Sequence, residues 1–340
     1  MKVEKICIYT STKMSILMKN VKAKAFAAIE SVVYSCNGVI FGGYVRDEYI
    51  REYHSEKFKN ESKYCMDKLK LDGIEEELFW NEKISPETRG RMIIAEDMDI
   101  SFQTVQESET FLKKLKDMVE FTYVVANEKK KYYSTVIKSV KNVKICIKVG
   151  MIPFICEGED LIIELDIVVG KTIAPFGNID MLCNGFIKTA EGKRYSRNTG
   201  TSIDKLSDYE HHMRVGKIME EMVNFRTELS FARTGRNKQE INRTALRRIK
   251  KMDEKGQGWE YTNMPIRVEK SEGGETCCIC YEEIGVGERM SYTVSKKEGR
   301  EIGGVKMHYG CCMRYLEHQS ERIVYRCPCR GEIDFSVIEV

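Results

Sequence analysis

Three short stretches, GGYVRD at 42–47, DMD at 97–99 and ELD at 164–166, decide how the first half of the chain folds. Each lies in or beside an apolar run of the kind that forms a β-strand. Glycine tolerates backbone angles that other residues avoid, and it has no Cβ to keep a ligand away. A helix that begins after such a turn directs its N-terminal amides at an anion. The first stretch therefore predicts a strand, a turn at Gly42 and Gly43, and a helix over 44–53 that starts beside a phosphate.

The aspartates of the other two stretches are predicted to share one face of a sheet. DMDISF at 97–102 alternates polar and apolar residues, and residues two apart in a strand point the same way. A neighbouring strand over 161–169 would bring Asp166 beside Asp97 and Asp99. Clustered carboxylates suit Mg²⁺ or Mn²⁺, and two such ions support an in-line phosphoryl displacement. The alternative interpretation is a solvated strand face next to an ordinary tight turn.

These stretches resemble the motifs of a known family. GGYVRD resembles the GGxVRD signature of the tRNA nucleotidyltransferase and poly(A) polymerase superfamily, and DMDISF resembles the DxD strand of that family. A weaker match is DMLCNGF at 180–186, which resembles the DFTxNAL segment. The resemblance covers residues 30–190 and implies an α+β fold, a DNA polymerase β-like palm in which helices flank a mixed sheet.

The resemblance also implies roles for individual residues. Gly42 and Gly43 would cradle phosphate, and Arg46 and Asp47 would orient the site. Asp97, Asp99 and Asp166 would be the catalytic ligands of the magnesium ions, and Asp180 and Asn184 would contact the nucleotide ribose. The implied activity is template-independent transfer of nucleotides from NTP to an RNA 3′ hydroxyl. A protein hydroxyl is another acceptor for the same chemistry, and no recognisable motif selects the nucleobase.

A second group of residues lies near the other end of the chain. Of thirteen cysteines, seven fall between Cys277 and Cys329. No apolar signal segment follows Met1 and no run is long enough to span a membrane, so we expect an intracellular, cytoplasmic protein. In a reducing compartment, clustered cysteines indicate metal ligands rather than disulfides. The pairs Cys277/Cys280 and His308/Cys311 have the spacing of a tetrahedral zinc site.

This tail resembles a RING-type zinc finger, also related to treble-clef modules. Ile279 stands where RING domains place an aliphatic contact for a ubiquitin-conjugating enzyme, and CPC at 327–329 supplies Cys327 and Cys329 for a second zinc. A standard RING would carry cysteine at the places of Lys306 and Arg314. Cys278, Cys312 and His318 are the candidates to substitute for them.

The predicted organisation has four parts: a nucleotidyltransferase-like domain at 1–190, a basic helical segment at 191–255, a linker at 256–274 and a zinc module at 275–340. Helices are also expected over 22–34 and 108–121. The net charge of +3 says little about partners, but nine Lys or Arg lie between Arg233 and Lys255. They follow an amphipathic helical pattern, which indicates either an RNA phosphate contact or a solvated helix face.

Two functions from different classes follow. The first is a nucleotidyltransferase whose zinc tail binds proteins; fusions of this style resemble proteins of large DNA viruses, which would place the chain in the host cytoplasm. The alternative is a RING-type ubiquitin ligase, or a zinc-dependent binding module, that carries an inactive nucleotidyltransferase fold. The intact aspartate set favours the first, and the incomplete RING pattern weighs against the second.

Overall fold

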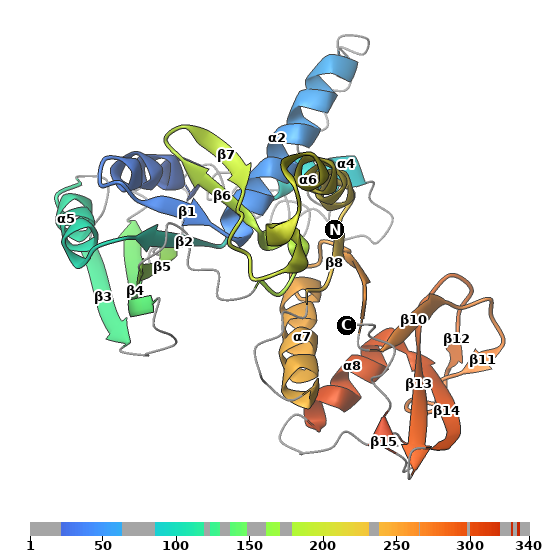
Figure 1. Ribbon diagram of the computed structural model, residues 1–340. Coiled ribbons are helices and arrows are strands. Elements are labelled where there is room, and N and C mark those ends of the chain that lie inside the picture. Colours follow the sequence, from blue (N-terminus) through green and yellow to red (C-terminus); the bar gives the residue numbers. More distant parts are fainter. Residues whose placement is uncertain are drawn as a thin grey trace, which may run out of the picture. The chain divides into compact units, whose positions relative to one another are not determined.

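The computed structural model describes residues 22–62, 86–118, 123–129, 137–147, 161–170, 179–230, 238–264, 266–297, 300–319, 328 and 332–333. The chain divides into two compact units, 1–225 and 226–340 (Figure 1). The division falls inside the segment predicted as basic and helical, so that its two helices belong to different units. Each unit is described by itself.

The first unit is built on a seven-stranded mixed sheet in the order β3-β4-β5-β2-β1-β6-β7. β2 and β5 are parallel, and all other neighbouring pairs are antiparallel. The strands are β1 (Val39–Phe41), β2 (Asp97–Phe102), β3 (Tyr123–Lys129), β4 (Ile137–Ile147), β5 (Leu161–Gly170), β6 (Phe186–Thr189) and β7 (Gly192–Tyr195).

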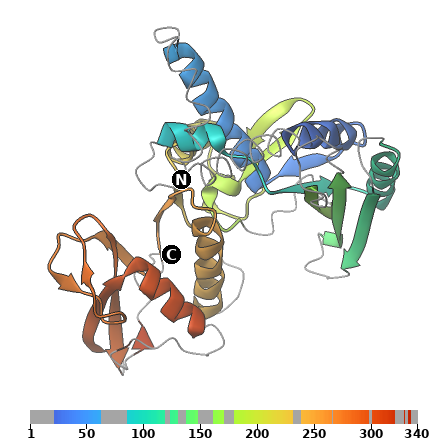
Figure 2. The ribbon, with the colours of Figure 1, turned by 180° about the vertical axis from the view of Figure 1, so that it is seen from behind.

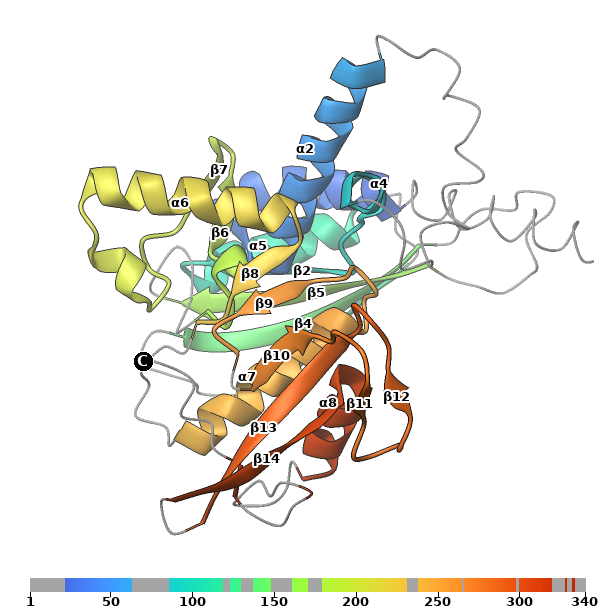
Figure 3. The same cartoon turned by 90° about the vertical axis from the view of Figure 1, so that its right-hand side faces the viewer.

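Helices α2 (Gly43–Ser62) and α5 (Val105–Lys116) pack on one face of this sheet. Figure 3 shows α2 and α5 on the same side of β4 and β5, and Figure 2 gives the view from behind. Buried Ile40, Met98, Ile100, Leu165 and Ile167 form the sheet side of that core. The helices are 22–34, α2 (Gly43–Ser62), α4 (Pro86–Met92), α5 (Val105–Lys116) and α6 (Asp208–Val223), with short 3-10 turns η2 (Leu182–Asn184) and η3 (Ser202–Lys205).

The second unit begins with β8 (Arg226–Glu228), which pairs in parallel with β9 (Glu260–Thr262) around α7 (Lys238–Asp253). A hairpin of β13 (Arg289–Lys297) and β14 (Arg300–His308) leads into α8 (Tyr309–His318). β10 (Arg267–Lys270) and β15 (Glu332–Ile333) also pair with β13. β11 (Glu275–Thr276) and β12 (Glu283–Ile284) form a second, short hairpin.

The segment predicted as a linker contributes to this unit. β9 and β10 both lie within 256–274, and β10 is hydrogen-bonded to β13. Its glycines mark turns, because Gly256, Gly258, Gly273 and Gly274 all have positive φ. A glycine-rich stretch can therefore alternate tight turns with short strands instead of spanning freely between domains.

Polar contacts join helix α7 to helix α8 and to strand β9. The Tyr309 hydroxyl donates to Oδ2 of Asp253 at 2.6 Å, and the Tyr261 hydroxyl donates to Oδ1 at 2.9 Å. Lys250 pairs with Glu317. The exposed side of α7 carries Arg247 and Lys251, as the amphipathic pattern predicted. None of the helices in the described ranges is long and apolar enough to cross a membrane.

Candidate functional site

The strand register brings the predicted aspartates together on the face of the first sheet opposite Met98 and Ile100. Asp99 stands directly opposite Asp166 of the parallel strand β5, and Asp97 stands opposite Glu164. Met98 and Ile100, which alternate with the aspartates, are fully buried on the other face. Asp97, Asp99 and Asp166 are half-buried. The expected neighbouring strand is thus β5, in the register that the carboxylates require.

The glycine turn lies next to this carboxylate row. Phe41, the last residue of β1, pairs with Asp99, and Gly42 follows it with φ of +75°. A Cβ on Gly42 would lie 3.0 Å from Oδ2 of Asp99. Gly43 opens helix α2, where the first amides have no acceptor inside the helix. The geometry therefore combines a row of oxygen ligands with the N-terminal end of a helix.

Arg46 and Asp47 are buried at the start of α2, each only 2% exposed. Nε of Arg46 donates to Oδ1 of Asp47 at 2.7 Å, and Nη1 donates to Oδ1 of Asn184 at 2.9 Å. Burial disfavours the charged form, but the Asp47 carboxylate outweighs this and raises the pKa of Arg46 above its ordinary value. These side chains tie α2 to η2, so they position the turn. Asp180, half-buried, precedes η2.

Glu164 is a carboxylate on the same face that the sequence patterns did not single out. It lies opposite Asp97, and its side chain forms a 2.6 Å ion pair with Lys144 of β4. Glu164 stands two residues before Asp166 in the sequence, and this spacing could have indicated that both side chains lie on one face of the strand. Within the described part of the chain, the oxygens of Asp97, Asp99 and Asp166 do not all lie within 4.8 Å of one another.

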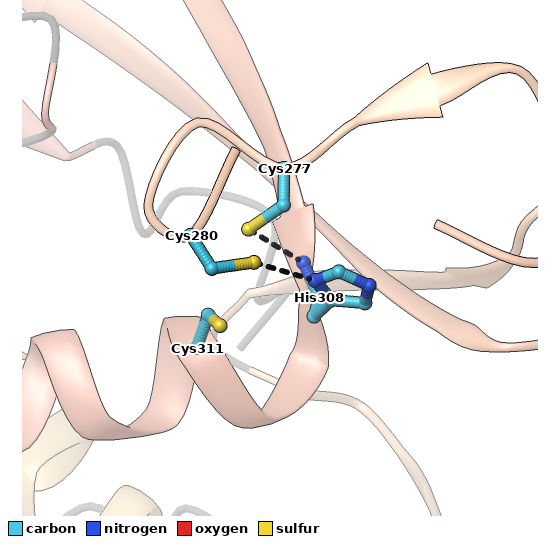
Figure 4. A group of neighbouring side chains, drawn as sticks. All are labelled: Cys277, Cys280, His308 and Cys311. Carbon is cyan, nitrogen blue, oxygen red and sulfur yellow. Dashed lines mark hydrogen bonds between the residues drawn. The ribbon is translucent and has the colours of Figure 1, made fainter. Parts of the chain in front are cut away.

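The second unit contains a compact metal-binding group. The ligand atoms of Cys277, Cys280, His308 and Cys311 all lie within 4.8 Å of one another. The two cysteines of the β11–β12 turn point toward His308, which ends β14, and Cys311 lies in the first turn of α8 (Figure 4). Nδ1 of His308 is 3.4 Å from Sγ of Cys280. Three sulfurs and one imidazole form a set that could hold a metal such as zinc, as the spacing predicted.

The protonation of this group favours a metal. Burial raises the pKa of the Cys277 thiol, but backbone amides of Ile279, Cys280 and His308 outweigh it and lower that pKa to about 6. The Cys277 sulfur in turn raises the pKa of His308. The Glu282 amide lowers the pKa of Cys280, but burial and the neighbouring thiols raise it to about 11. The lowered pKa of Cys277 favours the thiolate form that binds a metal, and binding would displace the protons of the other ligands.

Glu288 supports the histidine from outside the group. Its Oε2 lies 3.4 Å from Nε2 of His308, the nitrogen that faces away from the cysteines. The Gly285 amide donates to the same carboxylate at 2.9 Å. A carboxylate on the far nitrogen fixes the ring of a metal-ligating histidine. Sequence spacing alone did not identify Glu288, because its position depends on the turn between β12 and β13.

The predicted second zinc involves residues that the structure does not place. Cys327 and Cys329 lie outside the described residues. Of the proposed substitutes, Cys312 is fully buried, Cys278 is half-buried and His318 is exposed. Over the ranges that are described, none of these three belongs to a second cluster of metal-ligating side chains.

No protein-family model, curated protein or solved structure matches the chain.

Proposed function

We propose that the first unit is a template-independent nucleotidyltransferase that joins a nucleotide from NTP to an RNA 3′ hydroxyl. The observation that supports this most is the register in which Phe41, Asp99 and Asp166 stand side by side on three adjacent strands. That register puts the carboxylate row beside the Gly42 turn and the start of α2. A mixed sheet with helices on one face is also the architecture that a nucleotidyltransferase palm requires.

The donor set fits Mg²⁺ or Mn²⁺, since carboxylate oxygens are the ligands these hard cations prefer. Asp97, Asp99 and Asp166 are the residues that would hold them. When bound, such ions neutralise charge on the transferring phosphoryl group and lower the pKa of the acceptor hydroxyl.

The chain itself positions the reactants. The amides at the start of α2 receive the triphosphate, and Gly42 lets the phosphates approach the backbone. Arg46, held by Asp47 and Asn184, fixes the angle at which α2 leaves the sheet. The acceptor 3′ oxygen bonds to the α-phosphorus, the bond to the bridging oxygen breaks, and pyrophosphate leaves while the hydroxyl proton passes to solvent. Most of the acceleration comes from orientation and charge stabilisation.

The test is incorporation of each of the four α-labelled NTPs into an oligoribonucleotide with Mg²⁺ or Mn²⁺. Wild type should extend the RNA, and Asp99→Asn should reduce the rate by several orders of magnitude with unchanged thermal stability. Asp117→Asn, which alters an exposed carboxylate at the end of α5, is the matched control and should retain the rate. Transfer that survives in Asp99→Asn would refute the assignment.

A second candidate concerns the zinc module, which we propose binds a partner protein, with a ubiquitin-conjugating enzyme as the first to test. The Cys277–Cys280 turn presents half-buried Ile279 next to Tyr281, which is 81% exposed. A metal-fixed loop, a hairpin and a helix are the parts of RING and treble-clef modules. Ubiquitin transfer assays should give activity that Cys277→Ser with Cys280→Ser removes and Asp97→Ala with Asp99→Ala spares. If no ubiquitin is transferred with a broad set of conjugating enzymes, the ligase activity is refuted and the proposal reduces to binding of a partner protein.

A further inference from the structure

The first unit has a hollow of about 270 Å³ at the end of the sheet where β1 begins and the β6–β7 hairpin turns. Val39, Ser101, Gln103, Thr189 and Arg194 line it, together with Tyr34 from the end of helix 22–34. The lining mixes an apolar floor with hydroxyl, amide and guanidinium groups, and the exposed carboxylate of Glu191 lies in the hairpin turn beside them. Such a composition suits a small polar molecule or one part of a larger one.

The hollow lies on the face that carries the aspartates. Ser101 pairs with Val39 just as Asp99 pairs with Phe41, and Gln103 continues the same alternation. On the other side of β1, Ile187 pairs with Phe41 and with Arg194, so Arg194 belongs to this face as well. The hollow is therefore two residues along the strands from Asp99, on the side away from the Gly42 turn.

Two of the residues that line the hollow carry a buried hydroxyl for which the described part of the chain offers no hydrogen-bond partner. Ser101 is 1% exposed, and its Oγ finds no hydrogen-bond partner; the Tyr34 hydroxyl oxygen is also buried without one. Burial, with the nearby carboxylates of Glu30 and Glu48, raises the pKa of Tyr34, so this hydroxyl stays protonated. Buried hydroxyls are normally paired, and an unpaired one costs free energy that a ligand can recover.

An in-line displacement places the leaving and attacking groups on opposite sides of the phosphorus. If pyrophosphate leaves over Gly42 and Gly43, the attacking hydroxyl approaches from the other side of Asp99. That is the side on which the hollow lies. An RNA end arriving there would bring its last nucleoside to Ser101 and Tyr34, with Arg194 on the rim available to a backbone phosphate.

We propose that this hollow is the acceptor subsite, which holds the terminal nucleoside of the RNA being extended. This assignment rests on the proposed function and adds where the acceptor binds. Hydroxyls that both donate and accept can pair with a ribose hydroxyl or a base edge. The place of the hollow beyond Asp99, on the side away from the Gly42 turn, assigns it to the nucleoside end of the acceptor rather than to the incoming NTP.

The experiment fills the hollow and separates the two substrates. Gln103→Trp places an indole at the exposed mouth, and Gln106→Trp puts the same side chain on α5 away from it. The KM for a 5′-fluorescein pentaribonucleotide and the KM for NTP are measured separately. Gln103→Trp should raise the acceptor KM by about tenfold and leave the NTP KM within about twofold, whereas Gln106→Trp should change neither.

Ser101→Ala is the second variant, because it removes an unpaired hydroxyl without burying a new polar group. It should raise the acceptor KM while thermal stability stays equal or increases. An unchanged acceptor KM in both Gln103→Trp and Ser101→Ala would overturn the assignment. A rise confined to the NTP KM would also overturn it, since the hollow would then be on the donor side.

A failure of the proposed function itself is recognised separately. If wild type transfers no nucleotide, fluorescence anisotropy of the same pentaribonucleotide is measured instead. Binding weakened about tenfold by Gln103→Trp, but not by Gln106→Trp, would still support the hollow as a nucleoside site. If the pentaribonucleotide does not bind, or if Gln103→Trp does not change its affinity, the assignment of the hollow is overturned.

Discussion

Gly42 and Gly43 occupy the same turn but differ in what they require. Gly42 has φ of +75° and faces Asp99, whereas Gly43 is helical and a Cβ there would meet Arg46 at an ordinary 3.5 Å. Gly42→Ala should therefore lower the free energy of unfolding by about 1–2 kcal/mol.

Gly43→Ala should keep the free energy of unfolding within about 1 kcal/mol of wild type, yet raise the KM for NTP, because its methyl meets the phosphates. Urea unfolding and steady-state kinetics measure the two effects. A Gly43→Ala enzyme with normal NTP KM would show that phosphate does not approach this residue.

Arg46 is expected to stabilise the fold of the site through its buried ion pair with Asp47. Removing it leaves the Asp47 carboxylate buried without its cation, and loss of one partner of a buried pair typically costs about 3–5 kcal/mol. Arg46→Ala should lower the urea midpoint accordingly, whereas Lys116→Ala, which removes an exposed cation from α5, should change it little. Equal stability of the two variants would contradict the positioning role.

Residues could be predicted where spacing alone decides the chemistry. The Cys277/Cys280 and His308/Cys311 pairs and the alternating aspartates were visible because their geometry is local. Ser101 and Glu288 were not, because their roles arise from pairing between distant strands or from a turn, and Glu164 was visible only as an acid two residues before Asp166. A serine in an apolar strand carries no signal until the hollow beside it is known.

At the scale of elements, helix α2 runs well beyond its predicted end at residue 53. Its second half is charged and has no apolar periodicity, so no amphipathic pattern marks where the helix ends. What holds its middle is local packing: His54 lies against Gly90 of α4, where a Cβ would come within 1.9 Å of the ring, and its Nε2 is 2.7 Å from the Val223 carbonyl. The strand pattern of 97–102 and 161–170 was predictable because alternation fixes the buried face, but the pairing of β10 was hidden by its flanking glycines.

The His54 contact makes the first unit sensitive to acid. Burial lowers the pKa of His54 below its ordinary 6.5, although the Val223 carbonyl and Glu87 oppose this and Lys57 and Arg91 add to it. His54 therefore binds a proton more readily in the unfolded chain than in the folded one. The contribution of His54 to the free energy of unfolding is highest above pH 6.5 and decreases as the pH falls below that value. His54→Phe should reduce the difference between urea midpoints at pH 7.5 and 5.5. The same pH difference in wild type and variant would contradict this account.

At the scale of the whole molecule, two compact units predict two separable unfolding events. A zinc chelator should lower the melting temperature of the second unit, because metal binding is linked to folding, and should leave the first unit unchanged. Calorimetry with and without chelator measures this, and Cys277→Ser with Cys280→Ser should reproduce the chelated profile. If the chelator reduces nucleotide transfer but the double cysteine variant does not, the metals that the chelator removes are those of the first unit.

The four metal ligands come from two chain segments that enclose the β13–β14 hairpin. A bound ion would act as a crosslink that closes this loop, and the entropy of closing a loop grows only with the logarithm of its length, about 0.6 kcal/mol per doubling. Residues added between Lys297 and Arg300, at the far end of the hairpin, would therefore cost little. That point in the chain is where an affinity tag or a fluorescent reporter could be inserted while the metal site continues to form.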